Sequence, residues 1–133
     1  HPLFRERFVL GCSANHPLAA NEIVRGEDLL EFPFVDRLKC EFRDRILDHF
    51  ARRDLLMQPR FRSDREDWVQ RVVADGHAIC ILPERSATAH GLVTRPIDGF
   101  VLEREVVIAT VSGSTATVEI RKFAHLAARY KWN

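Results

Sequence analysis

The alternation of hydrophobic and polar positions is most regular between Ser63 and Pro83. Its first half has a helical period, with one apolar stripe formed by Trp68, Val69, Val72 and Val73. Gly76 then supplies the left-handed conformation that commonly ends a helix, and the apolar run at residues 78–82 predicts a buried strand ended by Pro83. A helix, a glycine, a buried strand and a proline in this order are typical of a doubly wound α/β unit.

The start of this helix carries a second signal. Ser63 and Glu66 have the spacing of a capping box, in which the hydroxyl and the carboxylate each accept a bond from a backbone N–H group. We therefore expect the helix to begin at Ser63. Loops before such helices gather at one edge of the sheet, where α/β proteins bind ligands.

The rest of the chain repeats these patterns. A second amphipathic helix is predicted from Glu41 to about Leu55, with an apolar face of Phe42, Ile46, Leu47 and Phe50. A last helix is predicted from near Thr115 to Tyr130, with a stripe of Ile120, Phe123, Ala124 and Ala127. A helical turn is expected at residues 27–31, and short extended segments at 8–12, 34–35, 60–62, 91–97 and 104–111, with an interruption at 112–114. The fold class that follows is α/β.

His16 lies in a turn formed by residues 15–19. Because Pro17 restricts the residue before it to extended conformations, no helix can run through His16. We interpret His16 as a solvent-facing turn residue, in preference to a ligand contact.

Composition narrows the functional classes. A chain of 133 residues with 46% hydrophobic content can form one compact core, or one lobe with part of another. Its 20 basic and 19 acidic residues nearly cancel, so charge alone recruits neither nucleic acid nor a membrane. No apolar run is long enough to span a membrane, and the first residues do not resemble a signal peptide. Since the chain lacks an initiating Met, we expect it to be a piece of a longer protein.

The chemistry-bearing residues do not form a catalytic or metal-binding pattern. The sequence contains no GxSxG elbow and no glycine-rich nucleotide loop. The cysteines have neither CxxC nor zinc spacing, which favours a reducing cytoplasm and predicts no disulfide framework, metal or other cofactor. They are Cys12, Cys40 and Cys80. We therefore do not expect an enzyme.

Two predicted strand-to-helix junctions carry the candidate binding residues. No Ser, Thr or Asn precedes the helix that begins near Glu41, so several N–H groups there are available to a ligand or to water. If the strands before the two junctions are parallel neighbours, both junctions lie at the same edge of the sheet. The candidate ligand contacts are Arg37, Leu38, Lys39, Cys40, Phe42, Arg62, Ser63, Asp64 and Arg65. Their cationic side chains favour a small carboxylate, and ordinary solvation of the loops is the alternative.

Three segments follow one another at characteristic spacing. The first is the run at residues 8–12 that leads into His16-Pro17-Leu18-Ala19. The second is the helix and strand at residues 72–83, and the third is Gly91-Leu92-Val93 before a strand and a final helix. In this order and spacing they resemble the C-terminal regulatory domain of LysR-type transcriptional regulators, and the resemblance covers essentially the whole chain.

The resemblance implies a fold similar to a type II periplasmic binding protein, in which two Rossmann-like lobes are joined by two crossover strands. A small-molecule effector binds between the lobes of such domains. By this likeness residues 1–8 are a crossover segment, 9–83 the effector-binding lobe, and 84–133 the return crossover, strand and helix of an incomplete first regulatory subdomain. Regulation of transcription would then act through an N-terminal winged helix-turn-helix that is absent from this chain, so this chain itself would contact neither DNA nor a membrane.

Two other functions stay open from the sequence. Cys40 lies at a predicted helix start beside Lys39 and Arg43, a setting that favours thiolate and therefore redox sensing. Cys12 and Cys80 lie in apolar strand runs and are expected to be inert. The final helix favours an oligomerisation module, because its apolar stripe would lack the segments that normally cover it and so would promote self-association.

Overall fold

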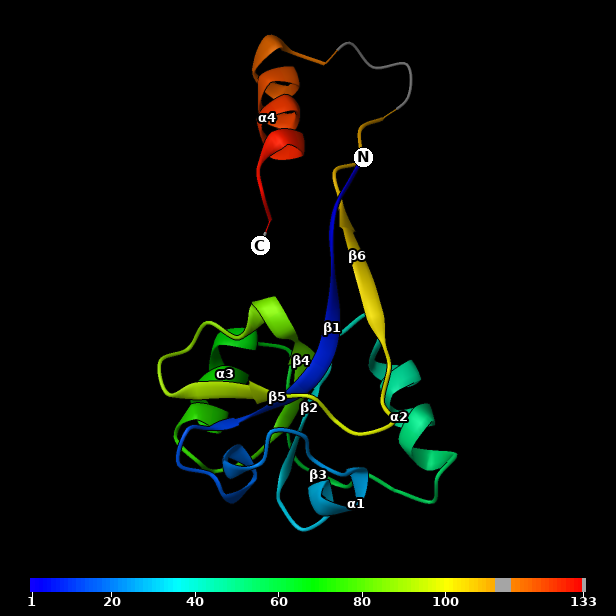
Figure 1. The fold of residues 1–133 in the computed structure, drawn as a ribbon, viewed down its shortest axis with the longest axis vertical. Coiled ribbons are helices and arrows are strands. Elements are labelled where there is room, and N and C mark those ends of the chain that lie inside the picture. Colours follow the sequence, from blue (N-terminus) through cyan, green and yellow to red (C-terminus); the bar gives the residue numbers. More distant parts are fainter. Residues whose placement is uncertain (112–115, 133) are drawn as a thin grey trace. The chain divides into compact units, whose positions relative to one another are not determined.

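The computed structural model describes residues 1–111 and 116–132, which alternate between strands and helices (Figure 1). The elements are β1 (Pro2–Ser13), the 3₁₀ turn η1 (Pro17–Ala20), α1 (Gly26–Leu29), β2 (Phe34–Arg37), α2 (Arg43–Ala51), β3 (Pro59–Ser63), α3 (Glu66–Ala74), β4 (Cys80–Pro83), the 3₁₀ turn η2 (Glu84–Ser86), β5 (Leu92–Arg95), β6 (Glu103–Val107) and α4 (Val118–Arg129). The predicted α/β class is confirmed. The predicted interruption at 112–114 and the predicted helix start near Thr115 lie outside the described residues.

The chain divides into two units. The larger unit is Arg7–Leu102, and the smaller unit combines His1–Glu6 with Glu103–Asn133. The sequence predicts that the return to the first subdomain starts at residue 84. That residue lies inside the larger unit. One reason is that β5 pairs antiparallel with β1, in the register Leu10↔Arg95.

The strands of the larger unit belong to an antiparallel sheet and to a two-stranded parallel sheet. β1 pairs antiparallel with β4 and β5, and β2 pairs parallel with β3. The two sheets meet where Val35 N donates to Ile79 O over 2.9 Å and Ile79 N donates to Pro33 O over 2.8 Å. β2 and β3 are thus the parallel neighbours that a common junction edge requires.

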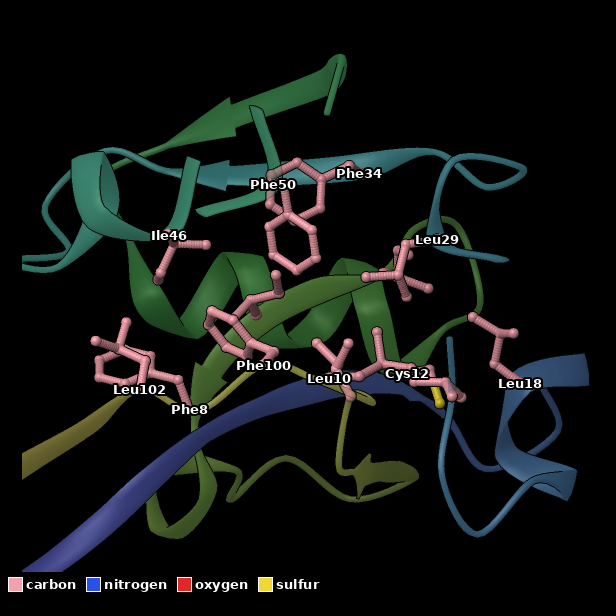
Figure 2. Close-up of a cluster of buried hydrophobic side chains, with 14 residues drawn as sticks. Phe8, Leu10, Cys12, Leu18, Leu29, Phe34, Ile46, Phe50, Phe100 and Leu102 are labelled. Atoms are coloured by element: carbon pink, nitrogen blue, oxygen red, sulfur yellow. The ribbon is translucent and has the colours of Figure 1, made fainter. Parts of the chain in front are cut away.

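Helices α2 and α3 lie on opposite sides of these strands (Figure 1), and their apolar residues belong to two separate buried clusters. Figure 2 shows the first cluster, in which alternate residues of β1 point the same way: Phe8, Leu10 and Cys12. Ile46 and Phe50 of α2 belong to the same cluster. Such alternation is the two-residue period of a strand.

The second cluster lies under α3 and contains Val69, Val73 and Cys80. Trp68 was predicted to be buried with them, but it is 40% exposed and meets the ring of Phe61 edge-on. Gly76, two residues after the last residue of α3, has φ +86°, which is the left-handed conformation predicted for it.

The smaller unit consists of paired strands and one helix. The start of β1 pairs with β6, and the buried carboxylate of Glu6 accepts a 2.8 Å bond from Arg104. In α4, Ala127 is buried, whereas Ile120 and Phe123 of the predicted stripe are exposed. None of the helices in the described part of the chain is long and apolar enough to cross a membrane.

Candidate functional site

The two predicted junctions lie side by side. β2 ends at Arg37 directly opposite Ser63, the last residue of β3. Leu38 N donates to Ser63 O over 3.0 Å, which continues the parallel pairing by one bond into the loop. We call residues 36–43 and 62–67, the segments brought together here, the junction edge.

An exposed ion pair connects the two loops of the junction edge. Lys39 Nζ lies 3.2 Å from Asp64 Oδ2, and the side chains are 76% and 53% exposed. Both residues were candidate contacts, and the structure brings them together. Their exposure leaves both groups accessible to a ligand.

Arg37 is held more firmly. Its Nε donates to Glu66 Oε2 over 2.9 Å and its Nη1 donates to Ile81 O over 3.2 Å, and the side chain is only 14% exposed. Glu66 in turn accepts a 3.0 Å bond from Gln70 Nε2. Arg37 therefore fixes the end of β2 to α3 and β4.

The predicted capping box is wrong. Helix α3 begins at Glu66, its N-cap is Arg65, and the Arg65 side chain makes no capping bond. Ser63 Oγ instead accepts a 3.1 Å bond from Arg65 N, which orders the loop before the helix. Glu66 cannot reach back to Ser63 because its carboxylate is bound to Arg37 and Gln70.

Asp36 is a buried charge that the sequence did not identify. It is 2% exposed, and both its oxygens accept bonds from Arg43, over 2.7 and 2.6 Å. Arg62 Nε lies 3.8 Å from the same carboxylate. A two-pronged arginine contact of this kind fixes geometry as well as charge. The only signal in the sequence was an acidic residue at the end of an apolar strand.

Arg65, the N-cap residue of α3, is paired with Asp67 in the first turn of that helix. Its Nη2 lies 2.6 Å from Asp67 Oδ2. That hydrogen bond, with a smaller contribution from N–H groups at the start of α3, holds the pKa of Asp67 below its ordinary value.

Every cation of the junction edge has a carboxylate of this chain within 4 Å. This result differs from the open cationic corner that the sequence suggested.

The apolar candidates have different positions. Leu38 is 47% exposed. Phe42 packs its ring 5.0 Å from that of Phe8, and the Arg45 guanidinium lies 5.3 Å from the centre of the Phe42 ring. Cys40 is half-buried and borders a cavity of about 10 Å³ beneath the junction edge, which has room for about one water molecule.

Cys12 and Cys80 are unsuited to redox sensing, as predicted. Cys12 and Cys80 are buried, and burial raises the pKa of the Cys80 thiol to about 12 and also raises that of Cys12. A sensor cysteine needs thiolate character and exposure. Within residues 1–111 and 116–132, no group of three or more His, Cys, Asp or Glu side chains is arranged to hold a metal ion.

His16 differs from its predicted role. Its Nδ1 accepts a 3.1 Å bond from Leu18 N and so caps η1, and its ring meets Phe32 at a centroid distance of 4.4 Å. Burial lowers the pKa of His16. The side chain is thus a half-buried structural residue and not a solvent-facing one.

Comparison with known proteins agrees with this architecture. The family model described as LysR substrate binding domain matches residues 1–131. The chain is similar to the regulatory domain of CcmR from Synechocystis PCC6803, solved in complex with 2-PG, with a TM-score of 0.78 and 21% identity over 96% of this chain and 64% of that one. It is also similar to the effector binding domain of QuiR in complex with shikimate, with a TM-score of 0.74 and 19% identity over 97% of this chain and 63% of that one.

A third similar structure is HinK, a LysR family transcriptional regulator from Pseudomonas aeruginosa, with a TM-score of 0.74 and 18% identity over 96% of this chain and 46% of that one. At these identities the likeness establishes the fold, which is the predicted α/β fold of type II periplasmic-binding-protein-like domains. The chain spans between 46% and 64% of the length of these three structures. A search among curated proteins gave no match.

Proposed function

Because this chain belongs to the LysR substrate binding domain family, we propose that it is the effector-sensing part of a transcriptional regulator. The observation that carries the proposal is the meeting of two strand-to-helix junctions at one edge of the larger unit. Ligands of α/β proteins bind at such edges. Two structural neighbours hold small molecules, which supports a small-molecule effector here.

Sensing of this kind requires no catalysis. A ligand shifts a conformational equilibrium by as much as its affinities for the two conformations differ. In this proposal the larger unit is the effector-binding lobe, and the smaller unit is part of the first regulatory subdomain. DNA is bound by another domain of the regulator, the regulatory domains self-associate, and the protein works in the cytoplasm, which its three unpaired cysteines support.

The effector contacts proposed here are the exposed members of the junction edge. Lys39 is the main cationic contact, because its side chain is the most exposed of the paired cations at this edge. Arg37 has a different role, since it is buried between Glu66 and Ile81 and positions the edge. A charge-assisted hydrogen bond from Lys39 favours an effector with a carboxylate or another oxyanion.

The test uses the complete regulator and a panel of small organic acids, screened for compounds that raise its Tm. For a compound that does so, Lys39→Ala should weaken binding roughly tenfold, because it removes one charge-assisted hydrogen bond. The Tm without ligand should stay within about 2 °C of the wild type, since exposed ion pairs contribute little stability.

Lys122→Ala is the matched control, because Lys122 is an exposed lysine on α4 in the other unit. It should leave both the affinity and the Tm unchanged. Unchanged affinity in Lys39→Ala would remove Lys39 from the site. A regulator whose DNA binding and Tm respond to none of the acids would count against acid sensing.

A further inference from the structure

We propose that the Asp64 carboxylate competes with the oxyanion of the effector for Lys39, and that this competition sets how tightly the site binds small organic anions. The inference rests on the proposed function, in which Lys39 contacts the effector. It adds that this contact is already occupied by a carboxylate of the chain, so binding is an exchange of partners at Lys39.

The ion pairs of the junction edge differ in how easily their cation can be released. Arg43 holds Asp36 with two short bonds, and Asp36 is 2% exposed. Releasing Arg43 would leave a buried carboxylate without its main partner, which is strongly unfavourable. Arg37 is likewise committed, because it bonds a carboxylate and a backbone carbonyl at once and is largely buried.

Lys39 is released at much lower cost. Among the described residues its ammonium makes one ion-pair contact, of 3.2 Å, and both partners remain hydrated when they separate. Exposed pairs of this kind contribute little to stability. A lysine ammonium is also a compact charge with three donors, so it does not need the planar geometry that a guanidinium demands of its partner.

The position of Asp64 makes it a competitor and not only a neighbour. Leu38 N bonds to Ser63 O, so the loop that carries Lys39 and the loop that carries Asp64 are held together at their base. In the proposed exchange a ligand oxyanion displaces the Asp64 carboxylate from Lys39, and it also meets the repulsion of that displaced charge. The ligand class is therefore an oxyanion, either a carboxylate or a phosphate, and Asp64 lowers the affinity for both.

The test is a titration of the full chain, labelled with ¹⁵N, with sodium acetate and with sodium phosphate at constant ionic strength. The amide shifts of Leu38, Lys39 and Cys40 report binding. Asp64→Asn should tighten the binding of acetate, phosphate or both about threefold to tenfold, because the competing charge is gone while the loop keeps a side chain of equal size. A gain with acetate only assigns the site to carboxylates, and a gain with phosphate only assigns it to phosphates.

Asp75→Asn is the matched control. Asp75 also forms an exposed ion pair, with Arg71 at 2.7 Å and side chains that are 49% and 56% exposed, but it lies at the other end of α3. The same change in net charge should alter anion affinity less than about twofold there. In Asp64→Asn combined with Lys39→Gln, the gain should be lost.

Three outcomes would overturn the inference. Asp64→Asn and Asp75→Asn could change the anion affinity equally, or the tighter binding in Asp64→Asn could persist when Lys39→Gln is added. The third outcome is that Asp64→Asn binds neither anion. These outcomes are separate from a failure of the proposed function. If Lys39→Ala still weakens the effector response of the complete regulator, the sensing site stands and only the competition is wrong. If Lys39→Ala leaves that response intact, the proposed effector contact is wrong, whatever the anion titration shows.

Discussion

Helices α2 and α4 have similar sequence patterns but different surroundings. Each has an apolar stripe opposite a row of charged residues. In α2, Phe50 is 1% exposed and its ring stacks on that of Phe100 at a centroid distance of 5.3 Å. In α4, Phe123 is 66% and Leu126 is 68% exposed. An apolar stripe therefore shows that a helix has a face to bury, but it does not show what covers that face.

The largest expected effect tests the buried side of this comparison. Phe50→Ala should lower the free energy of unfolding by about 3–5 kcal/mol, because it removes a large ring from a closely packed cluster and leaves a cavity. Urea denaturation followed by circular dichroism measures the change. A loss below about 1 kcal/mol would mean that the cluster in Figure 2 is loosely packed or collapses into the space.

The features that neighbouring residues determine were predicted from the sequence. The helix of residues 66–74, the left-handed Gly76 and the buried β4 follow from neighbouring residues, and each was predicted close to its observed place. The two junctions were expected to share an edge if their strands were parallel neighbours, and the pairing of β2 with β3 meets that condition.

Features set by distant residues were not predictable in the same way. The Gln70 amide holds the polar segment after β4 against α3, a contact that the sequence of the segment does not indicate. Gln70 Nε2 donates to Ser86 O over 2.7 Å, and its Oε1 accepts bonds from the amides of Thr88 and Ala89. Glu66 has the spacing of a capping residue, yet Arg37, 29 positions away, takes its carboxylate. Local spacing cannot reveal such long-range partners.

A smaller, pH-dependent effect is expected at His16. Burial holds its folded-state pKa below the ordinary value of 6.5, so the unfolded chain binds this proton more readily than the folded chain. The contribution of His16 to the free energy of unfolding is therefore fully present above about pH 6.5 and is lost as the pH falls through the folded-state pKa. Protonation also removes the Nδ1 acceptor that caps η1.

The measurement compares urea denaturation of the wild type and of His16→Asn between pH 7.5 and pH 5. Asparagine can still accept the capping bond but does not titrate. His49, whose pKa is also lowered by burial, titrates in both proteins and cancels in the difference. The wild type should lose more stability than the variant as the pH falls. Parallel curves would show that His16 has no effect on the pH dependence.

The smallest expected effect on stability is at the exposed side of the comparison. Phe123→Ala should change the free energy of unfolding by no more than about 0.5 kcal/mol, because the side chain is 66% exposed and leaves almost no cavity. Its effect on self-association should be larger, since an exposed apolar stripe of this kind favours contact with another surface. Sedimentation velocity over a range of concentrations should show weaker association for the variant than for the wild type.

Lys122→Ala, on the same helix but outside the stripe, should sediment as the wild type does. A wild-type chain that stays monomeric at high concentration would contradict self-association through this face, and a loss of several kcal/mol in Phe123→Ala would show that the stripe is covered within the chain.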